Sequence, residues 1–192
     1  MILEANCSVE FLSRPQFTQT EVLKVTRLTA ATLQTWVNRG LLDLSEQNPG
    51  TGKRRQYSAL DVVRLAIIKR LTRFGFSVSV ARTIARHGVA WCFGASDLSV
   101  VNLGTYLVIT PWDGPEPSSE AGRQWCAEGF RWSLETGLPE DIRLSDLGRF
   151  ATPSDPHRSP SEPFPTFLLL PIGEIVAAVL RDLRKLLKDE AQ

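Results

Sequence analysis

The sequence predicts a mainly α N-terminal winged helix-turn-helix, followed by a small α+β C-terminal domain that ends in a long amphipathic helix. Three observations predict this arrangement. Two short helical patterns lie close together within residues 18–40, a cluster of cations follows a glycine-rich segment within 49–55, and an apolar stripe with helical spacing runs through 172–187. The 192 residues, 43% of them hydrophobic, are enough for one or two domains with a packed core.

The first helical pattern begins at Thr18. This residue stands three positions before Glu21, which is the spacing of a capping box, in which each side chain pairs with the backbone N–H of the other residue. Val22, Leu23 and Val25 then give the helix an apolar side. We therefore expect a short amphipathic helix directly after Thr18.

The second helical pattern follows at once. Thr29 is placed to cap this helix. Leu33, Trp36 and Val37 follow at i, i+3 and i+4 spacing, so they face one side of it. Gly40 stands where a helix ends on a left-handed residue. Because only about three residues separate the two helices, the pair has the shape of a helix-turn-helix.

The exposed side of the second helix carries small and neutral hydrogen-bonding residues. A helix that reads base edges in the major groove needs such residues at its N-terminal end. Residues 29–32 are small enough to let the backbone approach closely, and Thr32, Gln34 and Thr35 are suited to bases or phosphates. The cations at 53–55 follow a glycine-rich tip, where they are placed to neutralise phosphates.

The order and spacing of these pieces resemble the MerR-type winged helix-turn-helix. The resemblance covers residues 17–88, under half of the chain, and implies a basic wing after the second helix and binding to double-stranded DNA. The matching pieces are Thr32-Leu33, Trp36, Arg39-Gly40-Leu41-Leu42, Arg54-Arg55-Gln56-Tyr57 and Gly75-Phe76-Ser77.

The pattern and the resemblance together give the set of expected DNA contacts. The chain departs from the family after Thr-Leu, where the family often has arginine and two aromatics and this chain has Gln34, Thr35 and Trp36. It also lacks the long dimerising helix with which many members continue, because no sustained heptad pattern follows Gly88. The expected DNA-binding residues are Thr29, Ala30, Ala31, Thr32, Gln34, Thr35, Arg39, Lys53, Arg54, Arg55 and Tyr57.

Two more helices are expected to complete this region. Ser58 precedes Asp61 with capping-box spacing and opens a helix with a broad apolar side, which Gly75 ends. Ser77 is placed to cap the next helix, which we expect to close the DNA-binding domain at Gly88. Residues 1–16, broken by Pro15, are expected to form a loose N-terminal arm.

The charge distribution supports a boundary at residue 88. Residues 1–88 carry 13 basic and 6 acidic side chains, a net charge of +7. Residues 89–192 carry 9 and 15, a net charge of −6. A basic N-terminal part beside an acidic C-terminal part is typical of a DNA-binding head joined to a body that does not bind DNA.

The C-terminal part, residues 89–192, reads as α+β. Residues 104–110 and 166–170 are short β-branched or aromatic runs that predict strands. The segment around Phe130 and Trp132 fits either a strand or a helix. Five prolines within 151–165 exclude regular structure there and predict an exposed loop.

The last helix is expected from Pro171 to about Lys188. Its apolar stripe is either the core of the C-terminal domain or a seam between two copies of the chain, and both uses are compatible. For a symmetric dimer we expect the contact to consist of Val176, Val179, Leu183 and Leu187.

Other chemistry is not indicated by the sequence. Three widely spaced cysteines do not form a metal-binding or disulfide pattern, so we expect no metal and no cofactor. No catalytic motif is present, which argues against an enzyme. The absence of a signal peptide or membrane-length apolar run predicts a cytoplasmic protein.

Two functions fit these features. The first is a sequence-specific, dimeric transcriptional regulator whose C-terminal domain dimerises or senses an effector, either a small molecule or a protein. The second is an architectural or excisionase-type recombination accessory protein, which shares the winged head and bends DNA. The large acidic C-terminal part favours the regulator, because excisionase-type proteins are little more than the head.

Overall fold

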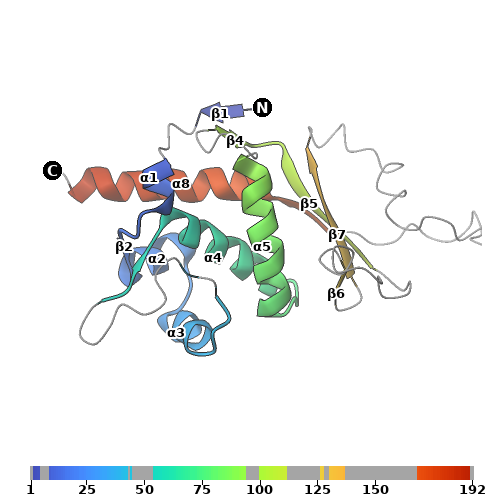
Figure 1. Ribbon diagram of the computed structural model, residues 1–192, viewed down its shortest axis with the longest axis horizontal. Helices are drawn as coiled ribbons and strands as arrows, with labels where there is room; N and C mark the ends of the chain where they lie inside the picture. The colour runs from blue at the N-terminus through green and yellow to red at the C-terminus, as the bar shows by residue number, and fades with distance from the viewer. Residues whose placement is uncertain are drawn as a thin grey trace, which may run out of the picture.

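The computed structural model describes residues 2–4, 9–42, 44, 54–93, 100–111, 126–127, 130–136 and 168–190. Helices of the N-terminal part surround a shared core, and a sheet from the C-terminal part stands at one end of them (Figure 1). The helices are α1 Val9–Ser13, α2 Gln19–Thr26, α3 Ala30–Asn38, α4 Ala59–Thr72, α5 Val78–Phe93 and α8 Ile172–Glu190. The strands are β1 Ile2–Glu4, β2 Phe17–Thr18, β3 Gln56–Tyr57, β4 Val100–Asn102, β5 Thr105–Pro111, β6 Cys126–Ala127, β7 Phe130–Thr136 and β8 Leu168–Pro171.

The two short helices begin and end as their sequence predicts. The Thr18 N–H and hydroxyl each donate to Glu21 Oε2 at 2.6 Å, so the capping box before α2 is formed. Thr29 caps α3 by accepting from the Thr32 N–H at 3.1 Å. Gly40, with φ of +63°, adopts the left-handed conformation after α3 that favours glycine. These local contacts fix the spacing between α2 and α3.

The capping box before α4 is buried. The Asp61 carboxylate accepts from the Ser58 N–H at 2.9 Å and from its hydroxyl at 2.8 Å, and both residues are almost fully enclosed. Gly75, with φ of +94°, lies in the turn after α4, and Ser77 accepts from the Val80 N–H at 3.3 Å at the start of α5. The predicted boundaries of both helices are therefore confirmed at their N-terminal ends.

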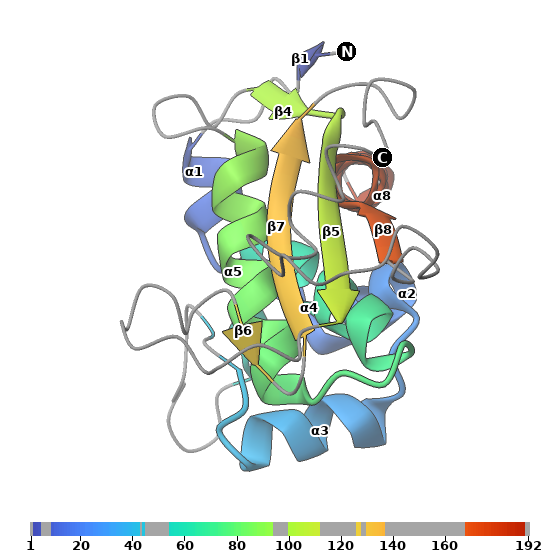
Figure 2. The same cartoon turned by 90° about the vertical axis from the view of Figure 1, so that its right-hand side faces the viewer.

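The C-terminal part contains a four-stranded antiparallel sheet in the order β6-β7-β5-β8. Thr105 to Pro111 of β5 pair along their whole length with β7, and β8 pairs with the other edge of β5. The segment around Trp132 is thus a strand, and β8 leads directly into α8 (Figure 2). Two smaller pairs, β1 with β4 and β2 with β3, tie the N-terminal segments to the rest of the chain.

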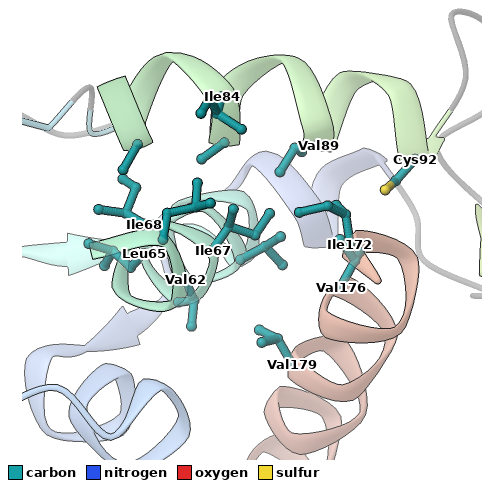
Figure 3. Close-up of a cluster of buried hydrophobic side chains, with 14 of the residues drawn as sticks. Val62, Leu65, Ile67, Ile68, Ile84, Val89, Cys92, Ile172, Val176 and Val179 are labelled. Atoms are coloured by element: carbon teal, nitrogen blue, oxygen red, sulfur yellow. The ribbon is translucent and has the colours of Figure 1, made fainter. Parts of the chain in front are cut away.

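One hydrophobic core joins the N-terminal helices to the C-terminal sheet. Helix α8 contacts α2, α4 and α5 as well as β4 and β5. Figure 3 shows Ile172 of α8 lying near Ile67 of α4 and Val89 of α5, with Val176 and Val179 farther along α8. The side of the sheet that carries Leu107 and Trp132 belongs to the same cluster of buried side chains. The last helix is therefore part of the core of the molecule.

This packing corrects the expected dimer contact. Val176 and Leu183 are 0% exposed and Val179 is 7% exposed within a single chain, while Leu187 is half-buried and packs against the same core. A side chain that its own chain covers completely has no surface left for a second copy. The apolar stripe on α8 is therefore intramolecular core. The apolar sides of α2, α4 and α5 cover it, which the short strands of the C-terminal part could not do alone.

The structure also differs from the expected limits of the N-terminal part. Residues 1–16 contain β1 and α1 where a loose arm was expected, and Leu12 of α1 is fully buried. Helix α5 continues through Gly88 to Phe93, so residue 88 lies inside an element. The proline-rich segment 151–165 lies outside the described residues.

Candidate nucleic-acid interface

Helix α3 presents a neutral polar face to solvent. Leu33 and Trp36 are buried and attach the helix to the core. Figures 1 and 2 place α3 at the end of the molecule opposite α8. The outward positions on α3 hold alanine, threonine and amide side chains, with no charged residue between Ala30 and Asn38. Among the described residues of α3, no acidic side chain is present to repel phosphates.

The expected contact residues of α3 lie on this face. Ala30, Ala31, Gln34 and Thr35 are exposed, as are Thr29 at its start and Arg39 at its end, and Thr32 is half-buried.

The polar side chains of α3 are held by hydrogen bonds within the helix. The Thr29 and Thr32 hydroxyls lie 2.7 Å apart, and the Thr35 hydroxyl donates to the Ala31 carbonyl at 2.8 Å. Gln34 Nε2 donates to Asn38 Oδ1 at 2.6 Å. These bonds restrict the side-chain rotamers before any ligand is present.

Arg54 and Arg55 directly precede β3, which is held by its short ladder with β2. Tyr57 of β3 pairs with Phe17 of β2. Next to β3, Arg54 is exposed and Arg55 is half-buried, while Lys53 lies outside the described residues. The ladder therefore places Arg54 at the surface close to the start of α2.

Tyr57 has a different role from the one expected. It is only 2% exposed, so its ring belongs to the core and is not available to DNA. Burial raises the pKa of Tyr57 above its ordinary value, and Arg55, through its charge and a hydrogen bond, acts in the opposite direction. The buried phenol thus restrains Arg55. The expectation of a direct contact by Tyr57 is corrected, because its side chain is buried in the hydrophobic core.

A cationic cluster beside the turn between α2 and α3 was not expected from the sequence. Lys69 of α4 donates to the Thr26 and Arg27 carbonyls at 2.9 and 2.6 Å and so satisfies the C-terminal end of α2. Partial burial, followed by the charges of Arg73 and Arg27, lowers the pKa of Lys69. Arg27 itself has φ of 54°, an uncommon conformation for a residue with a side chain. Arg27 and Arg73 are exposed beside Lys69.

A small hollow separates α4 and α5 from the segment that follows α3. Its volume is about 30 Å³, and it is lined by apolar residues with Asp61 and three arginines, Arg64, Arg82 and Arg86. That volume suits about one water molecule, whereas pockets for small organic ligands have volumes of several hundred Å³.

Cys92 is a buried free cysteine. Burial raises the pKa of Cys92 to about 12, against the smaller lowering effect of Thr105. The thiol therefore stays protonated at neutral pH, which disfavours metal binding. Within the described parts of the chain, no group of three or more histidine, cysteine or acidic side chains is placed to hold a metal ion. In the same parts, no helix is both long and apolar enough to cross a membrane.

Comparison with known proteins agrees with this geometry. The family model described as MerR HTH family regulatory protein matches residues 17–88. The matched segment begins at β2, contains α2, α3, β3 and α4, and ends within α5. No curated protein matches the chain. Residues 17–88, called the head below, therefore match the helix-turn-helix of the MerR family.

Proposed function

We propose that this protein is a sequence-specific transcriptional regulator that binds double-stranded DNA as a dimer. The observation that carries the proposal is the outward face of α3, which is neutral, polar and built from small residues on a MerR-type head. Such a face suits base edges in the major groove. In this proposal the protein binds and regulates, and it catalyses no reaction.

Cations around α3 would position the head on DNA. Arg54, next to the β2–β3 ladder, contacts one phosphate strand as part of the wing, with Arg55 behind it on the Tyr57 hydroxyl. Arg27 and Arg73 supply further charge beside the turn that precedes α3. Contacts of this kind fix register and supply affinity, while α3 supplies sequence preference.

The dimer follows from the size of the head. One head covers a small site, and helix-turn-helix proteins usually place two heads about 34 Å apart on one side of the duplex. Because Val176, Val179 and Leu183 lie in the core, the contact between copies uses other surface of the chain. The C-terminal part is the proposed place for dimerisation or for sensing an effector. Its core is continuous with that of the head, so a change there reaches α2 and α4 through α8.

Selection of bound fragments from genomic DNA, followed by salt-dependent affinity measurements, tests the proposal. We expect promoter DNA to be enriched. Replacing Arg54 with Ala should weaken binding to every sequence and reduce the salt slope by about 0.9, because one phosphate contact is lost. The matched control is Arg181→Ala, which removes another exposed arginine from α8, away from α3. This control should leave affinity and slope unchanged.

Three results would contradict the proposal. Equal losses for Arg54→Ala and Arg181→Ala would show that binding follows net charge and not the wing. Enrichment of phage attachment-site DNA in place of promoters would support the excisionase-type function. A sedimentation result of one protein chain per operator in the DNA complex would contradict the proposed dimer.

A further inference from the structure

The Gln34–Asn38 hydrogen bond has a consequence for base recognition. The two residues lie one helical turn apart on the exposed side of α3, where i and i+4 side chains meet. Gln34 Nε2 donates to Asn38 Oδ1 at 2.6 Å. On the same stripe one turn earlier stands Ala30, which is exposed and too small to shield Gln34 from a base edge.

The hydrogen bond changes what the Gln34 carboxamide offers to a ligand. A glutamine side chain has two N–H donors and one carbonyl acceptor. Asn38 occupies one donor, so one N–H and Oε1 remain for the base. The side chain is thereby limited to a single donor beside a single acceptor, in an orientation that Asn38 helps to fix.

Each base edge in the major groove makes a different demand on such a group. Adenine presents the N7 acceptor and the N6 amino donor, which match one N–H and one carbonyl oxygen. Guanine presents two acceptors, N7 and O6, and needs two donors. Cytosine and thymine each use only one of the two groups. Adenine is therefore the base that satisfies Gln34 while its bond to Asn38 is kept.

We propose that Gln34 reads an A·T base pair in each half-site and that Asn38 is the positioning residue that holds the Gln34 carboxamide for this contact. The inference rests on the proposed function, since it requires α3 to enter the major groove. Gln34 is one of the positions at which this chain departs from the usual pattern of MerR-type heads. Asn38 acts through Gln34 and need not touch the DNA.

The test compares affinities for the selected half-site with those for variants in which each base pair is changed in turn. For the full-length protein we expect one A·T pair whose replacement by G·C weakens binding by roughly 10- to 100-fold. Gln34→Ala should abolish the preference at that pair and leave the preference at other pairs intact. Asn38→Ala should reduce the preference at the same pair by about 3- to 10-fold, because Gln34 is no longer held in one rotamer.

A double variant and a non-specific duplex complete the design. If Asn38 acts only through Gln34, the double variant should discriminate no worse than Gln34→Ala alone. Affinity for a non-specific duplex should stay unchanged in all three variants, whereas damage to the fold of α3 would lower it. Asn38→Asp keeps the acceptor for Gln34. It should retain the A·T preference while its added charge lowers affinity for every sequence.

Each other outcome overturns a stated part of the inference. Full base preference in Asn38→Ala would remove its positioning role. Loss of a G·C preference in Gln34→Ala would contradict the adenine assignment. If the unmodified protein shows no sequence preference at all, the proposed function fails and this inference fails with it. That result differs from the first two, in which specific binding persists.

Discussion

At the scale of single residues, the sequence predicts contacts between near neighbours and misses those between distant residues. Thr18, Thr29 and Ser58 each cap a helix as expected, because the partner of a cap lies within three residues. Lys69, in contrast, donates to the Thr26 carbonyl, which lies 43 residues away in the sequence. No local sequence pattern predicts a contact between residues so far apart. The burial of Tyr57 could not be predicted for the same reason.

Gly88 provides a prediction at this scale. It lies within α5, and a Cβ added to it would meet Ile172 Cγ2 of α8 at 3.5 Å, an ordinary van der Waals distance. Glycine costs about 0.5–1 kcal/mol relative to alanine within a helix. We therefore expect Gly88→Ala to raise the free energy of unfolding by about that amount in urea denaturation.

Gly75→Ala is the matched control for this substitution. Gly75 has φ of +94°, so a Cβ there is strained although no atom lies within 4 Å of it. The same change of side chain should lower the free energy of unfolding by about 1 kcal/mol or more. Destabilisation by Gly88→Ala would show that α5 and α8 pack more closely than the structure indicates.

At the scale of elements, the position of α8 is the main feature that sequence reasoning could not supply. The apolar spacing predicts the helix and its length well, and the strands β5 and β8 are found where they were expected. Periodicity shows that one face is buried, but it does not identify the covering surface. A dimer seam and an intramolecular core have the same spacing, and the contacts of α8 with α2, α4 and α5 decide for the core.

Substitutions on α8 test this packing. Leu183 is 0% exposed, so Leu183→Ala should lower the free energy of unfolding by about 2–5 kcal/mol through lost burial and a cavity. Leu187→Ala, at a half-buried position on the same helix, should cost less. The association state of the folded protein should be the same for both variants and for the unmodified chain in sedimentation.

A folded monomer produced by Leu183→Ala from a dimeric parent would contradict this account and show that α8 forms the dimer contact.

The same packing affects an isolated N-terminal fragment. A fragment of residues 1–88 would lack α8, which contacts α2 and α4. That fragment would therefore expose apolar surface that the whole chain buries.

At the scale of the whole molecule, charge and shape are compatible with the proposed binding face on α3. The N-terminal part carries the positive charge, and α3 stands at the end of the molecule away from α8. Composition predicted the charge separation because it needs no knowledge of packing. The shared core could not be predicted from composition, because it contains residues from both the basic part before residue 88 and the acidic part after it.

The most direct test of the DNA-binding face is amide hydrogen exchange of the full-length protein, free and bound to a selected DNA site. We expect DNA to slow exchange in residues 29–39 and 54–57 and to leave the amides of α8 unchanged, because α8 lies on the opposite side of the molecule (Figure 1). Slowing confined to α8 or to the sheet, with α3 unaffected, would contradict the proposal that this protein reads DNA through α3.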